Sequence, residues 1–270
     1  MSVWAAVLLM YGAYMVTAEV YPLDMAINSV DDMYKGCEDK MLKNVKNFLK
    51  NETNNNPKFR DAWNEAEMYH NGKWKRNKKR SLEKNEAVAV YAYTNAQINI
   101  YDELNKAVRE QGPEYQTSFN YHSLHYFLTR AIQKLAAKQT EEKCHTSYRR
   151  TKVSFMEVPL NTKIRFGQFT SSSLHPLKLN KGKNLGKDFG EKSCFKIKTC
   201  FGADISIYSR YEDAEAEILI PPYEVFKVTK IETREKDKEL PCEVVYTVES
   251  TREPVSNYNC ALFKPSRSHG

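Results

Sequence analysis

The apolar residues of this 270-residue chain change their spacing once, close to Cys144. Before that point they recur every three or four residues, which is the spacing of an amphipathic helix. The spacing predicts helices over Glu38–Leu49, over a short segment around Phe59–Ala66, over Asn85–Glu110 and over Asn120–Lys138. Gly112 and Pro113 follow the longest of these helices and are suited to end it.

Beyond Cys144 the apolar segments are short, alternating and rich in β-branched and aromatic residues, as strands are. The predicted strands are Ser147–Ser154, Lys163–Thr170, Cys194–Cys200, Asp204–Tyr208, Glu215–Ile220, Glu224–Thr233 and Cys242–Ser250. The polar stretch His175–Lys187 is predicted to be a loop. The two halves together predict one α+β domain, with a helical lobe over about residues 19–140 packed on an antiparallel β lobe over about residues 144–265.

The two ends of the chain predict that it is secreted. Residues 3–16 are almost wholly apolar, too short to span a bilayer comfortably, and Val16-Thr17-Ala18 offers small residues for cleavage. We therefore predict a signal peptide over residues 1–18 and a single mature domain over residues 19–270. Residues 265–270 are polar and lack the hydrophobic tail of a lipid-anchor signal, so we expect no stable membrane insertion.

Six cysteines fit an exported chain, because an even number in an oxidising compartment indicates disulfides. Their wide spacing argues against a zinc site, and the sequence alone leaves many pairings open. Asn51-Glu52-Thr53 is an acceptor site for N-glycosylation. It lies in the polar stretch Asn51–Asn56, which predicts a surface loop.

The formal net charge of +7 owes much to the basic run at residues 73–80. Such a run is usually a solvated loop. A nucleic-acid groove would need aromatic residues interleaved over a longer stretch, and Trp74 is the one aromatic residue within this run. We therefore expect no nucleic-acid partner, although the positive field favours anionic ligands.

Two acids, Glu215 and Glu217, precede the apolar run Ile218–Ile220, which Pro221-Pro222 ends. Side chains at positions i and i+2 of a strand project from the same face. The sequence therefore predicts two carboxylates side by side at the mouth of a rigid element. Most such pairs are merely solvated, so other residues must decide whether this one has a function.

Three stretches of the β half could meet the acid pair: Tyr148-Arg149-Arg150, Phe169 to Ser173, and Phe189-Gly190. Arginine binds phosphate bidentately, and serine hydroxyls bond to sugar hydroxyls. A carboxylate beside an anomeric carbon can stabilise an oxocarbenium ion. Taken one at a time, an arginine like Arg149 is more often a surface strand residue, a serine cluster like Ser171–Ser173 is more often a turn, and a phenylalanine like Phe189 is more often in the core. Together they predict a site for a ligand with phosphate and ribose.

In order and spacing, four stretches resemble the vertebrate ecto-mono-ADP-ribosyltransferases, whose signature is an Arg, a Ser and a Glu-x-Glu. They are Tyr148-Arg149, Arg165 to Leu174, Thr199 to Ala203 and Glu215 to Pro222. Leu23 to Ala26, Ser29 to Tyr34, Ala92-Tyr93-Thr94 and His125 to Thr129 are also similar. The resemblance extends over roughly Tyr21 to Pro265.

The resemblance implies that NAD is the co-substrate. Arg149 would contact its diphosphate and nicotinamide ribose, Ser171 would position that ribose, and Phe189 would pack on the nicotinamide end. Tyr148 and Ser173 would complete the NAD site.

The acids would carry the chemistry, with Arg149 and Ser171 completing the catalytic set. Glu217 would bind the ribose 2′-hydroxyl and stabilise the cation left when nicotinamide departs. Glu215 would receive the acceptor, and in this family a Glu there accompanies arginine. A guanidinium has a pKa above about 12, so a carboxylate must hold it and take a proton as it attacks. The resemblance thus implies a secreted transferase acting on arginine side chains of extracellular proteins.

The resemblance further implies disulfides Cys37–Cys260 and Cys144–Cys200, which leaves Cys194 to pair with Cys242. It implies a helical lobe against two antiparallel sheets, with NAD in the cleft between them and no metal. We expect a monomer.

Two points stay open at this stage. An NAD glycohydrolase, in which water replaces arginine, or a catalytically silent binding module could share the fold, although the intact Arg149, Ser171, Glu215 and Glu217 argue against a silent one. Arg150 stands where the family usually has Gly, and this extra cation could either tighten or crowd the binding of the diphosphate.

Overall fold

The computed structural model of the chain describes residues 20–73, 81–138, 144–178, 186–211 and 216–264. The helices are α1 (Glu38–Asn55), α2 (Pro57–Lys73), α3 (Lys84–Thr94), α4 (Ile100–Glu110) and α5 (His122–Ala136). The strands are β1 (Val20–Tyr21), β2 (His145–Thr151), β3 (Ser154–Phe155), β4 (Lys163–Ile164), β5 (Thr170–Ser173), β6 (Ser193–Thr199), β7 (Ala203–Asp204), β8 (Glu217–Ile220), β9 (Phe226–Thr233) and β10 (Val244–Ser250). Short 3-10 helices are η2 (Lys187–Phe189), η3 (Ser206–Tyr208) and η5 (Ala261–Phe263).

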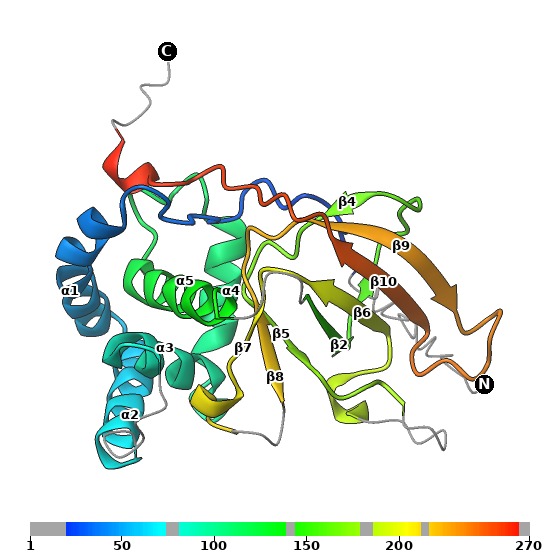
Figure 1. The fold of residues 1–270 in the computed structure, drawn as a ribbon, viewed down its shortest axis with the longest axis horizontal. Coiled ribbons are helices and arrows are strands. Elements are labelled where there is room, and N and C mark those ends of the chain that lie inside the picture. The colour runs from blue at the N-terminus through cyan, green and yellow to red at the C-terminus, as the bar shows by residue number, and fades with distance from the viewer. Residues whose placement is uncertain (1–19, 74–80, 139–143, 179–185, 212–215, 265–270) are drawn as a thin grey trace, which may run out of the picture.

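The helices gather on one side of the molecule and the strands on the other, which confirms the predicted α+β class (Figure 1). Within the described residues, one eight-stranded sheet has the order β4-β9-β10-β6-β2-β5-β8-β7, and β1 and β3 form a separate parallel pair. Neighbours in the large sheet are antiparallel except β10 and β6.

One mixed sheet thus replaces the two antiparallel sheets that we expected. Its weakest junction lies between β2 and β5, whose register consists of the single pair Tyr148 and Ser173. Alternation of apolar residues identifies a strand but not its partners, so the sequence could not distinguish these arrangements.

The longest predicted helix, Asn85–Glu110, is two helices, α3 and α4. Asn99 has a φ of 57°, a left-handed conformation that an α-helix does not contain. The Asn95 side chain accepts a hydrogen bond from the Gln97 N–H at 3.1 Å. Asparagine tolerates such turns and bonds to nearby backbone, so the chain bends where the apolar spacing continues. The helix expected around Phe59–Ala66 is longer than predicted and runs the full length of α2.

The polar stretch Asn51–Asn56 is not a surface loop, because α1 runs through most of it. The buried Glu52 carboxylate accepts the backbone N–H groups of His122 and Ser123 at 2.6 and 3.1 Å. These groups open α5, where N–H groups lack partners within the helix and negative charge is favoured. Asn51 of the predicted glycosylation site is exposed on α1.

Two predicted strands leave the extended conformation part of the way along. Lys163–Thr170 is interrupted between β4 and β5, and Gly167 there has a φ of 68°. Asp204–Tyr208 leaves the sheet after β7 and continues as η3. The Asp204 carboxylate accepts the Ser206 N–H at 2.9 Å, which favours this turn over an extended strand.

The first and last described segments run side by side along one edge of the molecule, from the sheet to the helical lobe (Figure 1). We call residues 22–37 and 251–260 the terminal strap. The Tyr258 N–H donates to the Asp31 carboxylate at 2.9 Å. Arg165, which follows β4, forms an ion pair with Asp31 at 2.6 Å, and neither side chain is exposed. The strap therefore binds the two lobes together through buried charge.

All six cysteines are paired, as Cys37–Cys260, Cys144–Cys200 and Cys194–Cys242. These are the pairs that we expected. The first closes the terminal strap and joins cysteines at a sequence separation of 223.

The predicted signal peptide and the basic run after Lys73 lie outside the described residues. Among the residues that are described, no helix combines the length and the apolar character needed to cross a bilayer.

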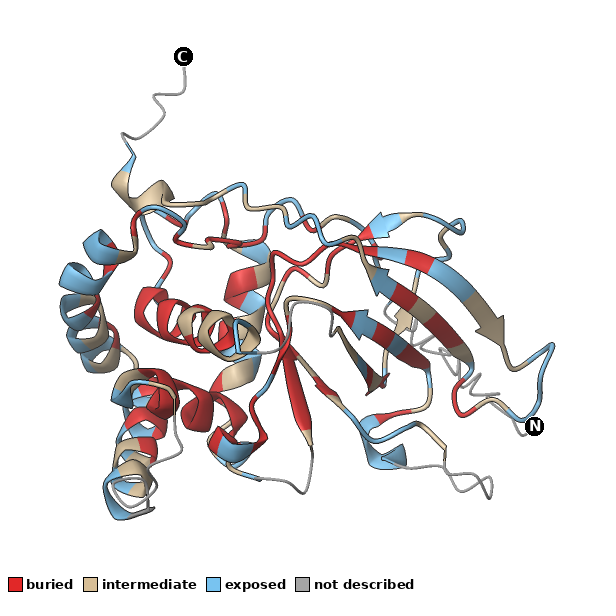
Figure 2. Cartoon of the chain, viewed as in Figure 1, coloured by how far each residue is buried: buried red, intermediate tan, exposed pale blue. Residues whose placement is uncertain are grey.

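Buried residues concentrate where the helices face one another and the sheet (Figure 2). His125 of α5 is fully buried there among aromatic rings. Its Nδ1 lies 2.8 Å from the Tyr34 hydroxyl and its Nε2 lies 2.9 Å from the Val30 carbonyl oxygen. Burial lowers the pKa of His125 to about 3, so the neutral ring accepts at Nδ1 and donates from Nε2.

We predict that His125 makes the protein less stable in acid. Its folded pKa of about 3 lies below the ordinary value of 6.5, so the unfolded chain takes the proton first as the pH falls. Its contribution is complete above pH 6.5 and is lost on acidification. Between pH 7.5 and 5, the unfolding free energy of the native protein should fall about 2 kcal/mol more than that of His125→Gln. Urea unfolding of both proteins at both pH values measures these free energies. An equal fall in the native protein and in His125→Gln would contradict the low pKa of His125.

Candidate active site

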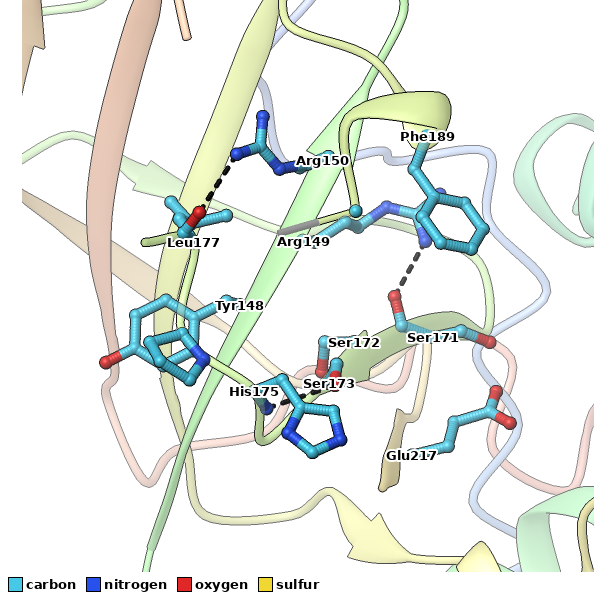
Figure 3. A pocket seen from close by; sticks show the side chains of 12 residues that line it. Tyr148, Arg149, Arg150, Ser171, Ser172, Ser173, His175, Leu177, Phe189 and Glu217 are labelled. Carbon is cyan, nitrogen blue, oxygen red and sulfur yellow. Dashed lines mark hydrogen bonds between the residues drawn. The ribbon is translucent and has the colours of Figure 1, made fainter. Parts of the chain in front are cut away.

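Three neighbouring strands, β2, β5 and β8, bring the predicted site residues together. Ser173 of β5 lies opposite Tyr148 of β2 on one side and opposite Glu217 of β8 on the other. Arg149 Nη1 donates to the Ser171 carbonyl oxygen at 2.7 Å, which joins β2 to β5 beside their single register pair. In Figure 3 the side chains of Arg149, Ser171 and Glu217 face a common space.

Glu217 is the first residue of β8, and only 4% of it is exposed. The Ser209 hydroxyl donates to Glu217 Oε2 at 3.2 Å. Ala216 has a φ of 43°, which is not an extended conformation. The strand therefore begins at Glu217, which corrects the predicted strand Glu215–Ile220 and the same-face argument drawn from it. Glu215 lies outside the described residues.

Tyr93 of α3 reaches the same space from the helical lobe. Its hydroxyl donates to the Phe169 carbonyl oxygen at 3.1 Å and accepts from Asn105 Nδ2 at 3.0 Å. Burial raises the pKa of Tyr93 to about 12, so the phenol stays protonated. A hydrogen bond with the Ser171 side chain opposes that shift. Tyr93 thus ties the helical lobe to β5 at the site.

Arg149 is partly enclosed, and desolvation lowers the pKa of its guanidinium. The negative charge of Glu217 and the neighbouring Tyr93 act in the opposite direction. An arginine remains charged even so, because its ordinary pKa is far above neutrality. The site therefore holds a cation and a carboxylate in a poorly solvated space, where electrostatic interactions are stronger than in water.

Two cavities meet at Arg149, with volumes of about 330 and 590 Å³. Both are lined by Arg149, Ser171, Phe189 and Glu217, so they form one elongated cleft. The smaller part is also lined by Tyr148 and Ser173, and the larger extends past Tyr93 to Tyr21. Such a cleft suits an elongated ligand whose negative charge lies near its middle.

Phe189 ends η2 at the mouth of the cleft and is 64% exposed. Figure 3 shows its ring close to Arg149. Ser173 was also expected to bind NAD. Its hydroxyl accepts a hydrogen bond from the His175 N–H, over 3.0 Å. An exposed aromatic ring at a cleft mouth is suited to cover a flat ligand group.

Arg150 lines both parts of the cleft, as Arg149 does, although consecutive side chains of a strand start out toward opposite faces. Its guanidinium binds backbone carbonyls, and Figure 3 shows it beside Leu177. Arg150 is thus a cation of the cleft whose guanidinium is engaged by backbone carbonyl groups.

Two contacts of the site were not predicted. Ser209, which binds Glu217, lies in a segment without any recognisable pattern. Tyr93 belongs to the stretch Ala92-Tyr93-Thr94, which is similar to the family. That similarity marked the stretch as part of the resemblance but did not place Tyr93 in the site.

In the described part of the chain, the one group of three possible metal ligands is Asp32 with Cys37 and Cys260. The two cysteines form a disulfide with each other, so they offer no thiolate.

Comparisons with known proteins agree with this geometry. A family model described as NAD:arginine ADP-ribosyltransferase matches residues 23–243. T-cell ecto-ADP-ribosyltransferase 2 of Rattus norvegicus is 37% identical over 239 residues, which are 88% of this chain and 79% of the relative. NAD(P)(+)--arginine ADP-ribosyltransferase 2 of Gallus gallus is 32% identical over 247 residues, covering 90% of this chain and 73% of the relative.

Solved structures give the same result. The crystal structure of the eukaryotic mono-ADP-ribosyltransferase ART2.2 superimposes with a TM-score of 0.70 at 35% identity, covering 89% of this chain and 98% of that one. A mutant of ART2.2 in complex with NAD has a TM-score of 0.66 at 33% identity, with the same coverage. On its sequence and its fold, the chain belongs to the NAD:arginine ADP-ribosyltransferase family.

Proposed function

We propose that this protein transfers ADP-ribose from NAD to arginine side chains of extracellular proteins and releases nicotinamide. The observation that supports this best is the meeting of Arg149, Ser171 and Glu217 at the middle of one elongated cleft. Its relatives are named ecto-enzymes, and three disulfides suit an oxidising compartment.

The binding roles follow from the chemistry of each group. Arg149 holds the diphosphate, since a guanidinium pairs with phosphate oxygens through parallel N–H groups. Ser171 positions the nicotinamide ribose, and Phe189 covers the nicotinamide. Tyr148 and Ser173 line the smaller part of the cleft, where they complete the NAD site.

The reaction breaks the glycosidic bond between the ribose C1′ atom and nicotinamide, which leaves with the electron pair. The ribose becomes an oxocarbenium ion, and Glu217 stabilises its positive charge while binding the 2′-hydroxyl. A guanidine nitrogen of the acceptor then bonds to C1′, and Glu215 takes the proton that this nitrogen loses.

We predict that Glu215→Gln separates the two halves of this reaction. Without the base, arginine modification should fall by about 100-fold or more, while slow hydrolysis of NAD continues because water needs no such base in a loose transition state. The measurement uses labelled NAD with a small guanidino acceptor and follows arginine adducts and free ADP-ribose separately. Glu249→Gln, an exposed acid on β10, is the matched control.

The same assay tests the proposal against its alternatives. Free ADP-ribose without adducts in the native protein would make it an NAD glycohydrolase. Absence of NAD binding in a titration would make it a silent module of the same fold. Equal adduct formation by Glu215→Gln and the native protein would remove Glu215 from the mechanism.

A further inference from the structure

The guanidinium of Arg150 joins three separate parts of the chain. Its Nη1 donates to the carbonyl oxygens of Gly190 at 3.3 Å and Pro241 at 3.1 Å, and its Nη2 donates to that of Leu177 at 3.0 Å. Only 7% of Arg150 is exposed. Three of its contacts are to backbone carbonyls and one, at 3.4 Å, is to Cys242 Sγ, so the arrangement depends mainly on the fork of the guanidinium.

The carboxylate of Glu191 acts on the Arg150 guanidinium through its charge, but its ion pair is with Lys187, at 3.6 Å. Within the residues that the structure describes, Arg150 forms no ion pair, and burial lowers the pKa of its guanidinium. A buried, unpaired charge is costly unless its hydrogen bonds are well made. We therefore attribute the presence of an arginine here to the carbonyl groups that it holds in place.

Two of those carbonyls lie at the ends of one connection. Leu177 follows β5 and Gly190 precedes β6, so one side chain fixes both described ends of the segment between these strands. The third, that of Pro241, adjoins Cys242, whose disulfide to Cys194 anchors it to β6. The guanidinium thus holds Leu177 and Gly190, on the connection from β5 to β6, against Pro241, which a neighbouring disulfide fixes in place.

A second feature holds the same end of the connection. Gly190 has a φ of 119°, and a Cβ atom there would lie 2.3 Å from the Thr151 carbonyl oxygen of β2. Only glycine permits this close approach. Phe189 comes directly before Gly190, and its N–H donates to the Gly186 carbonyl oxygen at 3.1 Å in the short turn of η2. Moving Gly190 would therefore move the Phe189 ring.

We propose that Arg150 is a positioning residue for the dinucleotide cleft: by holding Leu177 and Gly190 against Pro241, it sets the cleft wall and the place of Phe189. This inference rests on the proposed function, because the wall can have this role only if the cleft binds NAD. The wall contacts bound NAD before and during the reaction, whereas Arg149, Ser171 and Glu217 are fixed by strands. Loss of Arg150 should therefore weaken NAD binding and leave the chemical step nearly unchanged.

The test compares Arg150→Met and Arg150→Lys with the native protein. Lysine keeps the charge but cannot reach three carbonyls with one fork, so both variants should raise KM for NAD about tenfold and leave kcat within about twofold. Amide hydrogen exchange should become faster at Phe189 and Gly190 in both. Arg130→Met is the control, because Arg130 of α5 donates to Gln133 Oε1 at 2.6 Å and lines neither part of the cleft.

Each outcome decides the inference. Native KM and native exchange rates in both Arg150 variants would overturn it, and so would a native KM in Arg150→Lys alone, since that would assign the effect to charge. If Arg150→Met does not fold, Arg150→Lys decides by itself. If the native protein fails to bind NAD, the proposed function is wrong, while unchanged exchange at Phe189 and Gly190 would separately refute the positioning role.

Discussion

Replacing Glu217 by Gln is expected to lower the rate of nicotinamide release at least about 1,000-fold while leaving NAD binding and the fold intact. The Glu217 carboxylate is buried at the start of β8 and faces the space between Arg149 and Ser171. An amide has nearly the same shape and can still accept the hydrogen bond from Ser209, but it carries no charge to stabilise an oxocarbenium ion. Single-turnover nicotinamide release and equilibrium NAD binding measure the two effects separately.

A matched control for this variant is Glu224→Gln. Glu224 is also a buried carboxylate, and it accepts the N–H groups of Cys200 and Phe201 at 2.7 and 3.1 Å, but it lines neither part of the cleft. Its loss should lower the melting temperature without changing kcat per folded molecule. If Glu217→Gln kept more than about a tenth of native kcat, Glu217 could not be the stabilising charge.

Removal of the disulfide that closes the terminal strap has the largest expected effect on stability. The double variant Cys37→Ser with Cys260→Ser should lose about 5 kcal/mol of unfolding free energy, because the crosslink spans 223 residues and constrains the unfolded chain most. Urea unfolding of the oxidised protein at neutral pH measures the loss. Arg149, Ser171 and Glu217 lie on β2, β5 and β8, outside the terminal strap, so activity under native conditions should persist wherever the variant stays folded.

The variant Cys194→Ser with Cys242→Ser provides the comparison, since that bridge spans 48 residues and should contribute about 4 kcal/mol in the same chain-entropy model. A loss below about 2 kcal/mol for the strap disulfide would mean that its constraint on the unfolded chain is offset elsewhere, for example by the buried pair of Arg165 and Asp31.

The sequence predicted what depends on residue type and spacing. The change of periodicity near Cys144 separated the helical lobe from the sheet, and the apolar run after Glu217 marked a buried strand. The prediction from sequence was wrong where a single backbone angle decides where a helix or strand begins or ends. The left-handed Asn99 divides one apolar stripe into two helices, and the positive φ of Ala216 makes β8 begin at Glu217. No periodic pattern records such angles.

The candidate site shows a similar division. Residue chemistry suggested that Arg149, Ser171 and Glu217 could share a phosphate and ribose ligand, and the family resemblance implied the same. Their proximity depends on β5 lying between β2 and β8, a strand order that the sequence did not indicate. Ser209, which follows η3, and Tyr93 of α3 reach the site through contacts that no periodic pattern indicates. Arg150 lines the cleft with Arg149, but the sequence held no sign that its guanidinium would bind three backbone carbonyls.

The terminal strap also affects how the protein can be made. A ribosome adding about 5 to 20 residues per second needs about 10 to 45 seconds to pass from Cys37 to Cys260. During that interval the thiol of Cys37 meets four other cysteines before its own partner exists. Productive biosynthesis therefore requires either that Cys37 stays reduced until translation nears its end, or that an isomerase exchanges early mispaired bonds.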